Sequence, residues 1–149
     1  MSYTMETTKM KLWRSAAFII MLFVPVFASA QYRDLDSAMS NLARGFERGD
    51  TQQIIEGIST GDKVELEFPG LVSESGFFGR DQASYLLDEL FNKAKPSGFE
   101  RRSARKVSSS GSYNITAKWT VQQGERDLYI TLREQNGGWS IVSIRSSGR

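Results

Sequence analysis

The sequence predicts an α+β fold: two N-terminal helices, a short hairpin and a third, long helix, followed by an antiparallel sheet. Three observations support this. Apolar residues recur with a period of 3.6 over residues 34–48 and 80–94. They recur with a period of two over 63–68 and through most of 99–145. Gly, Pro and Asn occur between these segments, where they indicate turns. The sequence has no internal repeat or long linker, so residues 31–149 are expected to form a single domain.

The first helix is expected over residues 34–48, because its apolar residues form one stripe. Asp34 or Asp36 can accept a hydrogen bond from the first turn, and Gly49 can end the helix. The residues of the stripe are Leu35, Met39, Leu42, Ala43 and Phe46.

A second, short helix and a hairpin are expected next. Asp50 or Thr51 can cap this helix, which carries three isoleucines. Residues 63–68 then alternate strictly between apolar and polar, which is typical of a half-buried strand. A Pro-Gly turn follows, and residues 71–78 are expected to return as the second strand of the hairpin.

The third helix is the clearest, over residues 80–94, with Asp81 expected as its cap and Pro96-Ser97-Gly98 as its end. Its expected buried stripe consists of Ala83, Leu86, Leu87, Leu90 and Phe91.

Four strands are expected to complete the sheet, over residues 99–107, 113–121, 128–132 and 139–145. Asn136-Gly137-Gly138 predicts a tight hairpin before the last strand. The apolar phase of that strand switches between Ile141 and Val142, which indicates a β-bulge.

Residues 1–30 have the pattern of a secretory signal peptide. Lys9, Lys11 and Arg14 precede an apolar run, residues 16–27, and the small residues Ala28-Ser29-Ala30 suit a signal peptidase. This run is shorter than the roughly 20 residues of a membrane-spanning helix. We therefore expect cleavage before Gln31, no permanent membrane anchor, and a periplasmic or extracellular location.

Composition excludes several function classes. Three of the 19 basic residues and one of the 17 acidic residues precede Gln31, which leaves 16 of each and gives no support for nucleic-acid binding. The chain has no His and no Cys. Ser-His-Asp and Cys-His catalysis are therefore unavailable, conventional zinc sites are disfavoured, and we expect neither a metal nor a cofactor.

The order of elements resembles the nuclear transport factor 2-like (cystatin-like, α+β cone) superfamily, and most closely its small exported bacterial members of unknown function. The segments that carry the resemblance are 46–50 (FERGD), 64–66 (VEL), 79–83 (GRDQA) and 137–142 (GGWSIV). The resemblance implies a curved sheet wrapped around the long helix, an open cone that can hold a small apolar ligand, and homodimers formed through the sheet. Because function varies widely on this fold, the resemblance assigns none.

Candidate residues follow from these expectations. The candidates for lining a ligand pocket in the cone are Tyr85, Leu87, Phe91, Ile115 and Trp119. Asp88 and Tyr85 are the best candidates for acid–base chemistry. Glu65 and Glu67 alternate with core residues, so both are expected on the solvent face.

One basic cluster, Arg101, Arg102, Arg105 and Lys106, lies on an expected strand that would place Arg101 and Arg105 on one face, with Arg102 and Lys106 on the other. Three functions stay open. The first is an exported, non-enzymatic module that binds a ligand or partner. The second is a proton-transfer or dehydratase-type enzyme that uses a buried carboxylate and Tyr. The third is a structural protein of the envelope surface that uses the basic strand.

Overall fold

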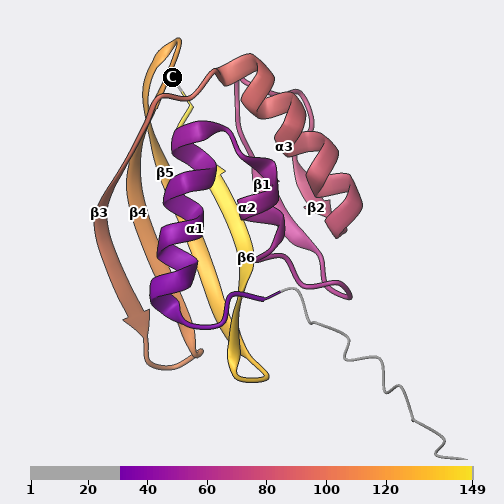
Figure 1. The fold of residues 1–149 in the computed structure, drawn as a ribbon, viewed down its shortest axis with the longest axis vertical. Helices are drawn as coiled ribbons and strands as arrows, with labels where there is room; N and C mark the ends of the chain where they lie inside the picture. The colour runs from indigo at the N-terminus through magenta and orange to yellow at the C-terminus, as the bar shows by residue number, and fades with distance from the viewer. Residues whose placement is uncertain (1–30, 149) are drawn as a thin grey trace, which may run out of the picture.

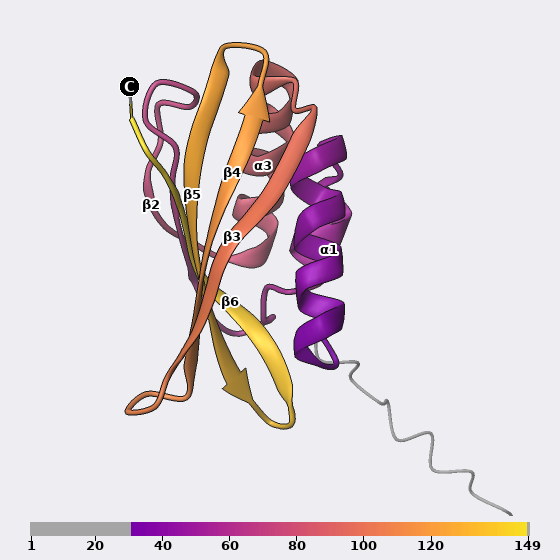
Figure 2. The same cartoon turned by 90° about the vertical axis from the view of Figure 1, so that its left-hand side faces the viewer.

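A six-stranded curved sheet with three helices on one of its faces makes up the fold in a computed structural model of the chain (Figures 1 and 2). The structure describes residues 31–148. The expected signal peptide, residues 1–30, and Arg149 lie outside the described residues. No helix within residues 31–148 combines the length and the apolar character needed to cross a bilayer.

The first two helices have the expected positions. Helix α1 (Leu35–Arg48) begins where Asp34 Oδ1 accepts a hydrogen bond of 2.7 Å from the Ser37 N–H, and this bond lowers the pKa of the Asp34 carboxyl. It ends at Gly49, whose φ of 69° is left-handed. Helix α2 (Thr51–Ile55) follows directly, with Asp50 as its cap.

Helix α3 (Arg80–Ala94) has the expected span but a different cap. The capping residue is Gly79, and Asp81 lies in the first turn. The side chain of Gln82 reaches back so that its Oε1 accepts the Gly79 N–H at 3.2 Å. The prediction of Asp81 as the cap was wrong, because the helix already begins at Arg80, which makes Asp81 its second residue.

The strands are β1 (Val64–Glu67), β2 (Gly76–Phe78), β3 (Gly98–Val107), β4 (Ser112–Val121), β5 (Gly124–Gln135) and β6 (Gly138–Ser146). They lie in the order β2-β1-β6-β5-β4-β3. All neighbouring pairs are antiparallel except β1 and β6, which are parallel. The sheet is therefore mixed, and the chain returns at its end to pair with its first strand.

The hairpin of β1 and β2 is shorter than expected. Only residues 76–78 pair with β1, whereas Leu71 and Val72 turn back and hydrogen-bond to the Phe68 carbonyl. Both are buried, so their apolar character reflects packing within a turn and does not indicate a strand.

The sheet has an outer face, which points away from the helices. One row of paired residues crosses this face from edge to edge: Phe77, Glu65, Ser143, Thr131, Asn114 and Arg105. The row begins with an aromatic side chain on β2 and ends with a cation on β3. The two ends of the outer face thus differ in chemistry.

Two bulges alter the alternation of the sheet. The bulge expected in the last strand is confirmed, because Thr131 pairs with Ser143 and Leu132 with Ile141, so Val142 is the extra residue. A second register shift lies in β3 between Arg101 and Ser103. It places Arg101 opposite core residue Ala117 and Arg105 opposite outer residue Asn114, so the expectation that both share a face was wrong.

The core lies between the helices and the inner face of the sheet. The side chains of Leu86, Leu90 and Trp119 are buried there, as expected. Tyr32 fixes the start of the described chain: its backbone pairs with Trp139, and its hydroxyl donates to the Gln53 carbonyl at 2.9 Å.

Candidate functional site

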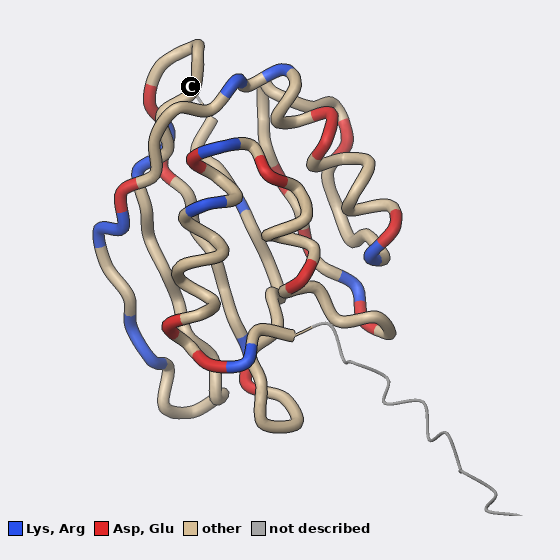
Figure 3. The backbone as a smooth tube through the Cα atoms, viewed as in Figure 1, with Lys and Arg blue, Asp and Glu red and all other residues tan. Residues whose placement is uncertain are grey.

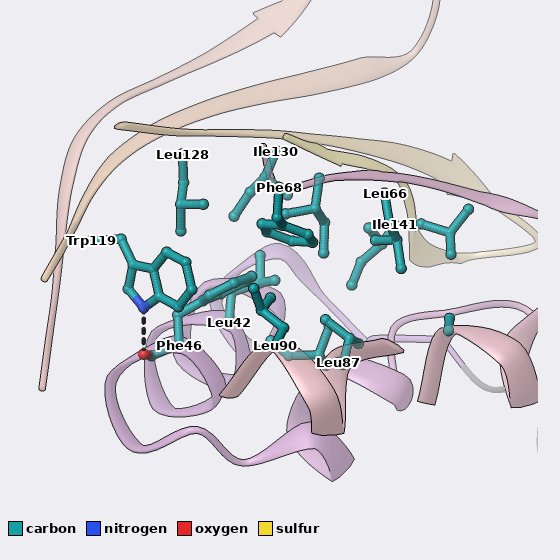
Figure 4. Close-up of a cluster of buried hydrophobic side chains, with 14 of the residues drawn as sticks. Leu42, Phe46, Leu66, Phe68, Leu87, Leu90, Trp119, Leu128, Ile130 and Ile141 are labelled. Carbon is teal, nitrogen blue, oxygen red and sulfur yellow. Dashed lines mark hydrogen bonds between the residues drawn. The ribbon is translucent and has the colours of Figure 1, made fainter. Parts of the chain in front are cut away.

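Four of the five candidate pocket residues lie in the hydrophobic core. Leu87, Ile115 and Trp119 are at most 1% exposed and Phe91 is 6% exposed. Figure 4 shows Leu87 and Trp119 among side chains contributed by the helices and by the sheet. Tyr85 is different, because it is 79% exposed on the outer side of α3.

An aromatic cluster packs around Trp119. The Phe46 and Trp119 rings meet edge to face at 5.4 Å between centroids, and Phe68 and Phe91 each lie 6.3 Å from the indole. The indole N–H donates to the Phe46 carbonyl at 2.8 Å (Figure 4). These contacts suit a packed interior in this part of the cone.

A hollow of about 280 Å³, which we call the α3 hollow, lies between α3 and the segment that contains β2. Its lining residues are Glu74, Phe78, Gln82, Tyr85, Leu86 and Glu89. Tyr85, Phe78 and Leu86 supply apolar surface, while Glu74 and Glu89 supply carboxylates. Glu89 pairs with Lys93 one helical turn away, so part of the acidic charge is compensated.

Only Tyr85 among the five candidates lines this hollow. Phe78, Leu86 and the other lining residues were not among the candidates from the sequence, since Leu86 was assigned to the buried stripe and Phe78 to a strand. Two signals were available. Tyr85 lies off the apolar stripe of its helix, and alternation in a strand forces one ring of the Phe77-Phe78 pair toward solvent. Phe77 is accordingly 66% exposed.

The acid–base candidates are at the surface. Asp88 is exposed and accepts a hydrogen bond of 2.5 Å from the Thr51 hydroxyl, which joins α3 to α2. Glu65 and Glu67 lie on the outer face, where Arg145 donates to Glu65 at 2.6 Å and lies 3.9 Å from Glu67. The bond with Glu65 raises the pKa of Arg145. These carboxylates therefore form surface ion pairs with Arg145 and a hydrogen bond between two helices.

A second hollow, which we call the edge hollow, has a volume of about 470 Å³ and lies beside the turn in which β3 ends and β4 begins. It is lined by Ser103, Arg105, Lys106, Val107, Ser108, Asn114 and Thr116. It includes two members of the basic cluster, which lies on the edge strand of the sheet. Figure 3 shows positive charge at two places along β3.

Metal binding would need several ligating side chains in one place. Within residues 31–148, no group of three or more carboxylates is arranged to hold a metal ion.

The helices, the curved mixed sheet and the element order define a nuclear transport factor 2-like fold. A similar structure is an NTF2-like protein of unknown function from Silicibacter pomeroyi DSS-3, with a TM-score of 0.53 and 16% identity over 77% of this chain and 92% of that chain. The resemblance inferred from the sequence is thereby confirmed.

Within this fold class, the chain belongs to the family described as domain of unknown function DUF4783, whose sequence profile matches residues 39–146. A DUF4783 protein from Bacteroides ovatus ATCC 8483 has a TM-score of 0.63 and 25% identity, over 72% of this chain and 91% of that chain. One from Bacteroides fragilis YCH46 has a TM-score of 0.63 and 23% identity, over 73% and 96%. No relative is found among curated proteins.

Proposed function

We propose that this chain is an exported, non-enzymatic binding module whose α3 hollow takes a small apolar group from a ligand. The observation that carries this proposal is the position of Tyr85, which is 79% exposed beside Phe78 and Leu86 in a concave site. A concave site with apolar and aromatic side chains and a few polar groups in its lining is the usual form of a ligand site.

The surface position of the carboxylates favours binding over acid–base chemistry. A carboxyl group that works as a general acid near neutral pH needs burial or a like-charged neighbour to raise its pKa. Asp88 is exposed and hydrogen-bonded to Thr51, and Tyr85 lies three residues earlier on the same helix with its ring in solvent. This pair lacks the apolar enclosure that the enzyme alternative requires.

Titration with the neutral dye Nile red tests the hollow. We expect its fluorescence to rise on binding, and Tyr85→Ser to remove most of this rise because the most exposed aromatic side chain of the lining is lost. Tyr129→Ser is the matched control, since Tyr129 is also exposed, at 49%, but lies on the sheet. Equal loss in both variants, or no binding by the original protein, would refute the proposal.

Export is supported by the charge, apolar run and small residues of segment 1–30. Expression in a bacterial host with mass analysis of the periplasmic fraction tests it. We expect a chain that begins at Gln31, and we expect Ala28→Leu with Ala30→Leu to block processing. An uncleaved chain in the cytoplasmic fraction would contradict this part of the proposal.

Homodimerisation is proposed through the outer face of the sheet, around Phe77 on β2 and Tyr129 on β5. Both rings are exposed, and Arg145 on the strand between them is neutralised by Glu65. Such a surface costs little to desolvate. Sedimentation equilibrium should show a dimer that Tyr129→Arg converts to monomer, whereas Tyr85→Arg should leave it intact. A monomer at all concentrations would exclude this dimer.

A further inference from the structure

We propose that the edge hollow is a binding site for a phosphate group. The residues that line it are Ser103, Arg105, Lys106, Ser108, Asn114, Thr116 and one apolar residue, Val107. No carboxylate is among them. The site is separate from the α3 hollow and requires neither export nor dimerisation.

The sheet register brings four of these side chains together. Ser103 pairs with Thr116 and Arg105 with Asn114, so all four lie in two adjacent rows of the outer face. Side chains directly opposite one another on antiparallel strands have Cβ atoms about 5 Å apart. The bulge at Arg102 creates this arrangement, because it shifts Ser103 and Arg105 into the outward phase.

Asn114 is oriented as a donor. The Thr131 hydroxyl donates to Asn114 Oδ1 at 3.2 Å, which occupies the carbonyl end of this amide. The Nδ2 group, which carries two N–H donors, is left to bind an acceptor. Together with the Arg105 guanidinium and the hydroxyls of Ser103 and Thr116 on the same face, it gives the edge hollow a surface of hydrogen-bond donors.

The cations of β3 are not neutralised by the protein. Among residues 31–148, no ion pair includes Arg101, Arg102, Arg105 or Lys106. All four are exposed on the edge strand. Their side chains are therefore open to solvent, and Arg105 is the one that the register places on the outer face.

This donor set fits a phosphate group better than other anions. A phosphate ester carries a charge of about −1.5 to −2 and three strong acceptor oxygens. A guanidinium and several neutral donors on one face match that demand, and Arg binds such groups in a bidentate manner. With Val107 as the only apolar lining residue, the hollow offers no wall for an acyl chain or a nucleobase.

Titration of the isotope-labelled protein with inorganic phosphate in 150 mM NaCl, followed by amide NMR shifts, tests the proposal. We expect saturable shifts at residues 103–108, 114 and 116. Arg105→Gln should weaken binding at least about 10-fold, the effect of losing one charge-assisted hydrogen bond. Thr116→Val should weaken it roughly 2- to 10-fold without changing the net charge.

Arg102→Gln is the matched control, because it removes the same charge from the same strand outside the lining of the hollow. We expect less than about a 2-fold effect, since salt screens the longer-range attraction. Equal weakening by Arg102→Gln and Arg105→Gln would reveal unspecific charge attraction and overturn the site. Absence of saturable shifts would also overturn it.

Vesicles distinguish the source of the phosphate. Binding to phosphatidylglycerol vesicles that is lost in Arg105→Gln, with none to pure phosphatidylcholine, would support the site and assign it to an anionic lipid headgroup. Saturable phosphate binding without vesicle binding would support it and assign a soluble phosphate compound. If Arg105→Gln keeps both the phosphate-induced shifts and the vesicle binding, the site is refuted.

Discussion

Trp119 joins the sheet to the end of the first helix. The last carbonyls of a helix lack partners within it, and the Phe46 carbonyl is one of these, since the N–H groups of Gly49 and Asp50 both bond to the Gly45 carbonyl. The indole N–H supplies the missing donor at 2.8 Å. One side chain thus contributes apolar packing and satisfies a buried acceptor.

Substitutions of Trp119 should separate these two contributions. Trp119→Phe keeps an aromatic ring but leaves the buried carbonyl unsatisfied, so we expect a loss of about 1–3 kcal/mol in the free energy of unfolding. Trp119→Ala should cost about 3–5 kcal/mol. Urea denaturation measures both, with Tyr129→Ala on the exposed face as control. Equal losses for Phe and Ala would contradict this account.

Tyr32 makes the stability of the fold depend on pH at the alkaline end. The ring is 2% exposed and fills the space that a side chain at Gly57 would need, since a Cβ there would lie 2.2 Å from it. Burial raises the pKa of the hydroxyl, and the charge of Glu56 raises it further. The unfolded phenol ionises near its ordinary pKa of about 10.

The sign of the effect follows from these pKa values. Because the folded-state pKa is the higher one, the contribution of Tyr32 is complete below about pH 10 and is lost as the pH rises. We expect Tyr32→Phe to lower stability by about 1 kcal/mol at neutral pH. It should remove a slope of up to about 1.4 kcal/mol per pH unit above pH 10. Parallel stability curves for both proteins between pH 8 and 11 would refute this assignment.

At the level of elements, the sequence predicted those features of the helices and strands that a local pattern determines. The helices and the bulge at Val142 were predicted from apolar periodicity. Each has a face that packs on the core, so the apolar residues reveal the period of a helix or the shift in a strand. The bulge at Arg102 left no such signal, since charged residues at an edge strand show no apolar phase. The parallel pairing of β1 with β6 was also missed, because alternation tells which side of a strand is buried but not which strand lies beside it.

A sequence pattern says less about a candidate site than about the fold, for a related reason. Leu87, Phe91, Ile115 and Trp119 are apolar because they build the core, and a sequence pattern does not distinguish a packed interior from a lined cavity. Tyr85 was the exception, since its place off the apolar stripe of α3 needs another explanation. The edge hollow depends on a bulge and a register, which only the folded sheet reveals.

The turn between β5 and β6 gives a prediction at the same level. Asn136 and Gly137 have φ values of 48° and 78°, the left-handed pair that a tight hairpin requires. Gly137→Ala should cost about 1–2 kcal/mol, because a Cβ is unfavourable in this conformation. Gly61→Ala is the control, since Gly61 has open space around it and no left-handed φ. A loss in both variants would point to a general effect of removing glycine.

The whole molecule has an open sheet, and its two edges are protected in different ways. Strand β2 is three residues long and pairs little backbone, whereas β3 spans ten residues and carries four exposed cations. A long edge strand invites pairing with another chain, and charge along it opposes that pairing. The basic cluster thus protects the edge of the sheet from pairing with another chain, in addition to any role in ligand binding.

This protective role can be tested apart from phosphate binding, because Arg101 and Arg102 lie outside the lining of the edge hollow. We expect Arg101→Thr with Arg102→Thr to raise the rate of aggregation, because Thr favours strand pairing and the repulsive charge is gone. Light scattering measures the rate of aggregation, under conditions in which each variant has the same folded fraction. The control is Arg44→Thr with Arg48→Thr, which removes the same charge from α1. Equal aggregation of the two double variants would show that net charge, and not the edge, keeps the chains apart.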